Sequence, residues 1–453
     1  MLEKESLTAL NAALARLDEG FGKLPPLEGG AGGQDRLEEI LRATAERLKD
    51  NYPYFHPLYA GQMLKPPHPV ARMAYALAMW INPNNHALDG GRATSAMEIE
   101  AVAEIAEMFG WKNFLGHLCG GGTMANLEAL WAAGQLHPGK RILASSQAHY
   151  THGRISAVLQ LPFESVPADR LGCMDTGALA KRLERGDVGT VVATMGTTAT
   201  GSVDPLPEIL ALRGKHGFRV HADAAYGGYF VLTGNLAAEA AAAFAQIARA
   251  DSIVIDPHKH GLQPYGCGCI LFRDPAVQRL YKHDSPATYF SSAELHLGEI
   301  SLECSRPGAS AAALWATQKL LPLAKGGEFA RGLERGREAA LTLHKKLQAD
   351  RRFVTALPPE LDIVVFAPRS ESASETSTLS RKIFEAAARR QLHLAVAELP
   401  LHFWEADLGG MKRDRETLTC LRSVLMKPEH LDWVERIWEL LSGATAEVLE
   451  GRA

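Results

Sequence analysis

The stretch between His221 and Lys259 constrains the fold of this chain more than any other part of the sequence. Asp223 closes a short apolar run, residues 218–222, in the string FRVHAD. A second apolar run, residues 253–255, is followed at once by Asp256-Pro257-His258-Lys259. Short apolar runs of this kind are typical of buried strands in a parallel sheet, whose carboxyl ends meet along one edge. We therefore expect a carboxylate and a lysine amine to lie side by side at a sheet edge.

This pairing suits pyridoxal 5'-phosphate, which needs a carboxylate at its pyridine nitrogen and a lysine amine for its Schiff base. The glycine-rich stretch at residues 118–133, LCGGGTMANLEALWAA, supplies a third part, because it opens a predicted helix. Backbone amides at a helix N-terminus bind phosphate. Gly122 lets the backbone approach closely, and Thr123 adds a hydroxyl group. The stretch lacks the lysine of a Walker A motif, and it follows LGHL rather than a clean hydrophobic strand.

Other polar residues follow predicted strands. His149 comes just after the run at 141–145, where its ring could stack on a flat cofactor, whereas His152 fits the surface as well as the site. Thr197 and Thr198 follow the run at 190–195, where a hydroxyl group could reach the cofactor or form a turn.

Strand-like runs alternate with amphipathic helical patterns through the middle of the chain. The alternation predicts an α/β fold, with a mostly parallel sheet covered by helices on both faces. The run at 268–272 follows the one at 252–256 too closely for a helical crossover, so we expect an antiparallel neighbour there. A long helical stretch is expected from about residue 309 to about 350. Strands at 361–369 and 418–426 with two helices predict a small α+β C-terminal domain. The domains are predicted as residues 1–90, which are helical and extended, 91–325, which bind the cofactor, and 326–453.

Composition excludes several classes of protein. The net charge is −4, from 48 basic and 52 acidic residues, and no basic stretch suggests nucleic-acid or membrane binding. No apolar stretch approaches the length of a membrane span. The charged, amphipathic N-terminus has no unbroken apolar region, so we do not expect it to act as a secretory signal. Cys267 and Cys269 suit strand packing better than metal binding, so we expect no metal. Scattered cysteines indicate a reducing compartment, and the prediction is a cytoplasmic protein.

The chain resembles the group II pyridoxal-phosphate-dependent amino-acid decarboxylases, over roughly residues 50–440. The resemblance rests on GGGTMANLEAL, SSQAHYT, ATMGTTATGSVDP, HADAAYGG and DPHKHGLQPYGCG, in that order. It implies the aspartate aminotransferase fold (fold type I) and the decarboxylation of an L-amino acid to an amine and CO₂ through an internal aldimine, an external aldimine and a quinonoid.

The resemblance also implies roles for individual residues. Lys259 would form the internal aldimine, Asp223 would pair with the pyridinium nitrogen, and His149 and Ala225 would lie against opposite faces of the ring. The phosphate would be held by Gly122, Thr123 and His258. Arg422 matches a position near the substrate carboxylate, although a structural ion pair would explain it equally well. Tyr289, in HDSPATYFSSAELH, is the candidate proton donor on a mobile loop, with packing as the alternative. His260 departs from the family, in which a tryptophan often follows the lysine.

Two other kinds of function remain open from the sequence. A pyridoxal-phosphate-dependent aldehyde-lyase or aminotransferase would share the fold, and a non-catalytic scaffold could have kept it. The aromatic, proline-rich segment at 51–73 cannot form a long regular element, and it either lines a pocket or packs on a neighbouring subunit. We therefore expect a homodimer with active sites at the interface.

Overall fold

The computed structural model describes residues 4–22, 24–25, 34–281, 296–404 and 408–451. A seven-stranded sheet forms its centre, in the order β1-β7-β6-β5-β4-β2-β3. The strands are β1 Leu115–Cys119, β2 Arg141–Ser145, β3 Phe163–Val166, β4 Val188–Thr194, β5 Arg219–Asp223, β6 Ser252–Ile255 and β7 Gly268–Phe272. Five of these strands, β2 to β6, run parallel, and β7 is antiparallel to both β6 and β1. The predicted mostly parallel sheet and the antiparallel strand after β6 are both confirmed.

Helices cover both faces of this sheet because its strands are apolar on both sides. In β4, Val191 packs into the core on one face, while its neighbour Val192 packs into a separate cluster on the other. The first face is covered by α4, α7, α8, α9 and α10, and the second by α5 and α6. These helices are α4 Leu88–Met108, α5 Gly122–Leu136, α6 Thr151–Val158, α7 Thr176–Leu183, α8 Leu206–His216, α9 Ala238–Ala245 and α10 Gly308–Leu320.

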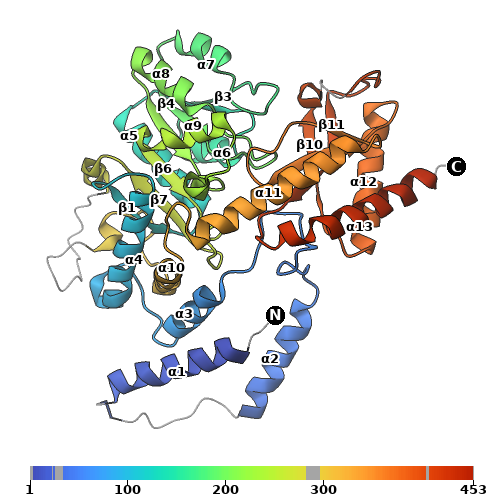
Figure 1. The fold of residues 1–453 in the computed structure, drawn as a ribbon. Coiled ribbons are helices and arrows are strands. Elements are labelled where there is room, and N and C mark those ends of the chain that lie inside the picture. The colour runs from blue at the N-terminus through green and yellow to red at the C-terminus, as the bar shows by residue number, and fades with distance from the viewer. Residues whose placement is uncertain (1–3, 23, 26–33, 282–295, 405–407, 452–453) are drawn as a thin grey trace.

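A second, antiparallel sheet is formed by the C-terminal part of the chain, in the order β10-β11-β9-β8. Its strands are β8 Phe353–Thr355, β9 Ile363–Pro368, β10 Ala395–Pro400 and β11 Thr417–Val424. Figure 1 shows it beside α11 Glu328–Ala349, α12 Ala373–Arg389 and α13 His430–Glu450, whose apolar residues share one core with the sheet. The predicted small α+β unit is confirmed, whereas its boundaries, and those of the other two predicted domains, stay predictions.

The N-terminal helices α1 Lys4–Phe21, α2 Gln34–Leu48 and α3 Pro69–Met79 lie at one end of the molecule (Figure 1). Helix α3 begins within the segment expected to be irregular, because Pro69 fits the first turn of a helix. Short 3-10 helices are η1 Gly228–Leu232, η2 Ile247–Arg249, η3 Pro275–Leu280, η4 Leu297–Glu299 and η5 Leu401–Trp404.

The structure refines two further expectations. The helical stretch expected over 309–350 consists of two helices, α10 and α11, because residues 321–327 (LPLAKGG) interrupt it with a proline and two glycines. The glycine-rich stretch does follow a strand, since LGHLC forms β1.

Candidate active site

A cavity of about 500 Å³ opens where the ends of β4, β5 and β6 meet the N-terminus of α5. Ligands of open α/β sheets bind at this edge. The structure brings seven of the predicted site residues together around the cavity: Gly122, Thr123, His149, Asp223, Ala225, His258 and Lys259.

Asp223 lies at the end of β5 as a buried carboxylate held by three donors. His152 Nε2 donates to its Oδ2 at 2.8 Å, Asn126 Nδ2 donates to the same oxygen at 3.4 Å, and the Ala225 backbone N–H donates to Oδ1 at 3.2 Å. Burial alone would raise the pKa of Asp223, but the hydrogen bond and charge of His152 outweigh it and lower the pKa below its usual value. Asp223 therefore stays ionised although it is 5% exposed.

Asn126 is oriented in turn by His221, two residues before Asp223 on β5. The Asn126 side-chain oxygen lies 2.8 Å from His221 Nε2, and His221 Nδ1 lies 2.9 Å from Ser252 Oγ on β6. Burial lowers the pKa of His221 to about 3, so the ring is neutral at pH 7. Because Asn126 accepts from His221 through its oxygen, its amide group points to Asp223.

Lys259 follows β6, and its Nζ lies 2.9 Å from Asp256 Oδ2. The other carboxylate oxygen of Asp256 is buried with no hydrogen-bond partner in the described part of the chain, and so is Nδ1 of His258. Burial also lowers the pKa of His258. Both residues line the cavity, so these atoms lie close to the space that a ligand would occupy.

Gly120, Gly121 and Gly122 form a tight turn at the start of α5, here called the cradle, in which a side chain does not fit. Gly121 has φ 143°, which side chains rarely adopt, and no side chain caps this helix. A Cβ atom on Gly122 would lie 2.7 Å from Asp256 Oδ2. The first-turn amides of α5 therefore remain available to an anion.

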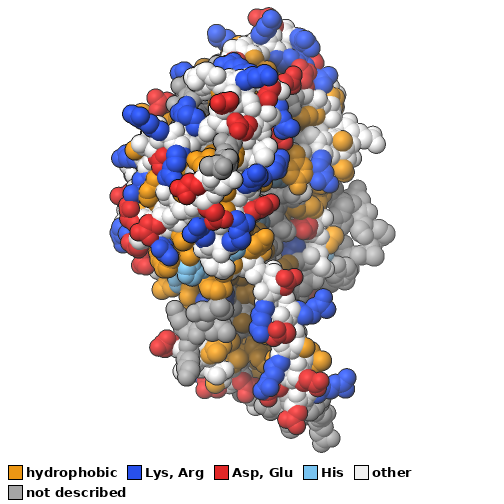
Figure 2. All heavy atoms as spheres, turned by 90° about the vertical axis from the view of Figure 1, so that its right-hand side faces the viewer, with side chains coloured by type: hydrophobic (Ala, Val, Ile, Leu, Met, Phe, Trp, Pro, Cys, Tyr) orange, Lys and Arg blue, Asp and Glu red, His pale blue; other side chains and the backbone are white. Residues whose placement is uncertain are grey.

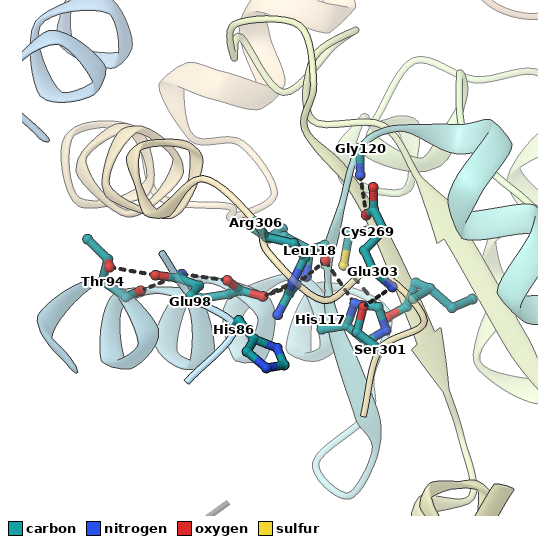
Figure 3. Close-up of polar contacts among 12 residues, drawn as sticks. His86, Thr94, Glu98, His117, Leu118, Gly120, Cys269, Ser301, Glu303 and Arg306 are labelled. Carbon is teal, nitrogen blue, oxygen red and sulfur yellow. Dashed lines mark hydrogen bonds and ion pairs between the residues drawn. The ribbon is translucent and has the colours of Figure 1, made fainter. Parts of the chain in front are cut away.

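A buried ion pair behind the cradle fixes the end of β1 (Figure 3). Arg306 Nη1 lies 2.8 Å from Glu98 Oε1, and the same carboxylate oxygen accepts from the Leu118 backbone N–H at 3.0 Å. Figure 3 also shows Glu303, whose Oε2 accepts from the Gly120 N–H at 2.8 Å. Glu303 thus places a negative charge at the edge of the cradle.

His149 lies on the cavity wall with a defined tautomer. Its Nδ1 accepts from the Thr151 backbone N–H at 3.3 Å and lies 2.8 Å from the Thr151 hydroxyl oxygen. Burial lowers the pKa of His149, with the nearby Lys259 charge contributing, so that a neutral ring faces the cavity at pH 7.

Other predicted site residues lie elsewhere. Thr197 is fully buried, and its hydroxyl oxygen accepts a hydrogen bond from the Ser202 N–H and lies 2.8 Å from the Thr200 hydroxyl oxygen. Thr197 therefore stabilises the turn, whereas the adjacent Thr198 lines the cavity. Arg422 is 4% exposed and donates to the backbone carbonyls of Gly61, Thr198 and Ala199.

Arg422 thereby ties β11 to the loop after β4, and its role at a substrate carboxylate stays a prediction. Tyr289 lies outside the described residues, so its role also stays a prediction. The aromatic segment packs within its own chain, with the Tyr54 and Tyr59 rings 4.9 Å apart and the His56 and Trp433 rings 4.8 Å apart. None of these four rings lines the cavity.

Sequence reasoning left the place of His152 open and missed Asn126 and Glu303. His152 is 1% exposed, which corrects the view that it fits the surface as well. Asn126 follows Gly122 by four residues and so shares its face of α5, a spacing that could have identified it. Nothing local in the sequence marks Glu303.

The model of the pyridoxal-dependent decarboxylase conserved domain matches residues 37–369, well over half of the sequence. The chain belongs to the pyridoxal-dependent decarboxylase family. It is 28% identical to an L-tyrosine decarboxylase of Enterococcus faecium, with 64% of each chain covered. It is 30% identical to a probable L-tyrosine/L-aspartate decarboxylase of Methanothermobacter thermautotrophicus, with 57% of this chain and 70% of the relative covered. The chain thus spans less than two thirds of the length of the Enterococcus protein.

Solved structures show the same fold at low sequence identity. The Catharanthus roseus tryptophan decarboxylase in complex with L-tryptophan matches with a TM-score of 0.76 at 16% identity, covering 99% of both chains. The Oryza sativa TDC with PLP and tryptamine matches with a TM-score of 0.77 at 19% identity, covering 94% of this chain and 90% of that one. The expected family and fold are confirmed.

The residues of the cavity fit pyridoxal phosphate. The glycine cradle offers helix amides to a phosphate group, and a Cβ atom there would fill the space. The ionised Asp223 suits a protonated ring nitrogen, and the unpartnered Asp256 Oδ1 and His258 Nδ1 leave polar atoms for the ligand.

Proposed function

We propose that this protein is a pyridoxal-phosphate-dependent decarboxylase that converts an L-amino acid to its amine and CO₂. The observation that carries the proposal is the single cavity that holds an ionised Asp223, the Lys259 amine and an uncapped glycine-rich helix start. The names of the curated relatives, L-tyrosine and L-tyrosine/L-aspartate decarboxylase, support the same reaction.

Each side chain has a role that follows from its position. The cofactor, when bound, supplies an electron sink for the bond to the departing carboxyl group. Asp223 would keep a proton at the ring nitrogen of the bound cofactor, because a carboxylate with a lowered pKa favours a cation beside it. Lys259 supplies the amine that holds the cofactor covalently.

The remaining cavity residues would bind the cofactor and orient its ring. Gly122, Thr123 and His258 would hold the phosphate, while the neutral ring of His149 and the methyl group of Ala225 would lie against the two ring faces. The Asp256 carboxylate 2.9 Å from Lys259 Nζ orients the amine at the cavity wall.

The substrate that we propose first is an aromatic L-amino acid, with L-tyrosine as the lead. The names of the relatives support this choice. Incubation of the cofactor-loaded protein with each of the twenty amino acids, labelled at the carboxyl carbon, would score the release of labelled CO₂. We expect release from L-tyrosine together with an equal amount of tyramine.

The same assay separates decarboxylation from the other reactions of this fold. An aldehyde product would indicate an aldehyde-lyase, and a 2-oxo acid an aminotransferase. Either product without labelled CO₂ would overturn the proposal. No reaction with any amino acid, in a protein that binds the cofactor, would support a scaffold instead.

We also propose a homodimer. Helix α2 exposes Leu37, Ile40, Leu41 and Leu48 along one stripe, and Trp80 after α3 is 70% exposed. Figure 2 shows hydrophobic side chains gathered between the N-terminal helices and the body of the molecule. An apolar surface of this kind needs a partner surface. Sedimentation at micromolar concentration should give twice the chain mass of 49.1 kDa, and a fully active monomer would contradict the proposal.

A cytoplasmic location is proposed as well, because all six cysteines are free thiols, as expected in a reducing compartment. In the described part of the chain, no helix has the length and apolar character needed to cross a membrane. Fractionation of cells that make the protein should recover it with cytoplasmic markers.

A further inference from the structure

A second cavity, of about 670 Å³, lies outside the proposed active site and has no role in the proposed reaction. It opens beside the starts of α11 and α13 and the segment that precedes α3, which lie close together in Figure 1. Tyr226 and Asp362 separate the two cavities. Tyr226 lines the first cavity, and its hydroxyl group donates to Asp362 Oδ1 at 2.5 Å. The second cavity is lined by His260 and Lys65, which lie on the other side of Asp362.

Two lysines in this cavity lack an ion-pair partner within the described residues. Lys427 is 3% exposed, and its Nζ donates to the Tyr59 carbonyl oxygen at 2.6 Å. Lys65 Nζ donates to the Met426 carbonyl oxygen at 3.3 Å. Burial lowers the pKa of Lys427 to about 7, with repulsion from Lys65 contributing, and burial lowers the pKa of Lys65 to about 8. The charges of Glu429 and, for Lys65, of Asp362 raise these pKa values but do not offset burial, so an anion beside the two lysines would stabilise their charged forms further.

His260 adds a buried polar side chain without a hydrogen-bond partner. It is 1% exposed, and neither ring nitrogen makes a hydrogen bond within the described residues. Its Nε2 lies 3.3 Å from Asp362 Oδ2 without hydrogen-bond geometry. Such groups are rare in folded proteins and call for an explanation such as a ligand.

The rest of the wall defines the shape and charge of a ligand. The charged residues on the wall are four cations, Lys65, Lys427, Arg331 and Arg335, and two carboxylates, Glu328 and Glu429, so the wall carries excess positive charge when both lysines are protonated. Arg335 is already paired with Asp432 at 2.6 Å. The apolar side chains on the wall are Phe55, Pro66, Pro67, Leu262, Leu321 and Phe329.

We propose that this second cavity binds a small phosphate monoester, whose dianionic group lies between Lys65 and Lys427 and whose apolar body packs on the proline and phenylalanine wall. Two ammonium groups match the two charges of a phosphate monoester. The volume exceeds what inorganic phosphate alone would fill and lies in the range of small-molecule sites. This site is distinct from the cradle at α5, and the inference does not depend on the proposed reaction.

Calorimetric titration of the cofactor-loaded protein with phenyl phosphate tests the proposal, because the bound cofactor occupies the cradle at α5. We expect one saturable site per chain, together with proton uptake, since an anion raises the pKa of both lysines. The uptake is measured by repeating the titration in two buffers of different ionisation enthalpy. Inorganic phosphate should bind more weakly, because it lacks the apolar body.

Substitutions locate the site. Lys427→Met and Lys65→Met should each weaken the binding of phenyl phosphate at least about tenfold, the effect of losing about 1.4 kcal/mol of charge-assisted contact. Lys382→Met, on an exposed part of α12, is the matched control and should bind as the wild type does. Lys65 is only partly buried, so its variant carries the test if Lys427→Met does not fold.

Two results would overturn the proposal. One is the absence of saturable binding to the wild-type protein. The other is equal affinity in the Lys65→Met and Lys382→Met proteins, which would mean that phenyl phosphate binds elsewhere.

Discussion

Removal of the His152 side chain isolates the contact that keeps Asp223 ionised. His152 Nε2 and Asp223 Oδ2 are 2.8 Å apart, and the two residues are 1% and 5% exposed. A hydrogen bond to a charged group contributes about 1.5–3 kcal/mol, and loss of one partner of a buried pair costs about 3–5 kcal/mol. Because Ala225 and Asn126 still donate to Asp223, at 3.2 and 3.4 Å, we expect His152→Ala to lower the free energy of unfolding by about 2–3 kcal/mol at pH 7.

The effect of His152→Ala should depend on pH in a defined direction. In the wild type, burial raises the pKa of Asp223, but His152 brings the net value below the usual one. Asp223 thus stabilises the fold above its unfolded pKa, about 4, and this contribution is lost as the pH falls further. In the variant, the remaining contacts offset less of the effect of burial, so the folded pKa of Asp223 rises and the ionised carboxylate stabilises the fold less. The difference between the two proteins should therefore be largest at pH 7 and shrink towards pH 4.

Urea unfolding of the cofactor-free proteins, followed by tryptophan fluorescence from pH 7 to pH 4, measures this difference. His216→Ala, at an exposed histidine near the end of α8, is the control and should change little. A loss that is the same at every pH would refute the argument, because it would show that His152 acts by packing and not through the charge of Asp223.

Three further outcomes follow from the same site. Asp223→Asn should keep the fold and bind the cofactor but lower kcat by about 10²–10³, the usual effect of removing a preorganised electrostatic partner, as steady-state CO₂ release would show; a near-normal kcat would contradict its role. Glu303→Gln should tighten cofactor binding, because it removes a negative charge from the cradle at Gly120. Fluorescence titration with pyridoxal phosphate measures the affinity, and weaker or unchanged binding would contradict this expectation. Tyr289→Phe should release CO₂ but delay the amine in rapid-quench experiments, since a phenol can return a proton to carbon; equal rates of the two products at the wild-type level would assign the proton to another group.

The sequence predicted the strands that carry the site because they are short, mostly apolar and followed by polar residues, although Arg219 and His221 interrupt the apolar residues of β5. It missed β1 because His117 interrupts the run, and only the structure shows that His117 is buried against Glu128, with 3.0 Å between His117 Nε2 and Glu128 Oε2. It missed β3, a strand at the edge of the sheet. Only the last of its four residues, FESV, is buried, so the strand has little apolar character.

Within the site, the sequence placed residues near strand ends but could not give the direction of each side chain. Thr197 and Thr198 are adjacent and equally polar, yet only Thr198 lines the cavity. His152 lies in the first turn of α6, where its side chain could point towards solvent or towards Asp223. Arg422 reaches backbone carbonyls from distant segments, and such contacts have no local signature.

Borohydride trapping tests the central claim most directly, because three lysines compete as the residue that holds the cofactor. Lys65 and Lys427 have lowered pKa values that would favour reaction of their amines, whereas Lys259 lies beside Asp256 in the cavity with the cradle. Reduction of the cofactor-loaded protein, digestion and mass spectrometry would locate the bond. We predict a phosphopyridoxyl group on Lys259 in the wild type and none in Lys259→Ala. A modified Lys65 or Lys427 at full stoichiometry, with Lys259 unmodified, would contradict the account.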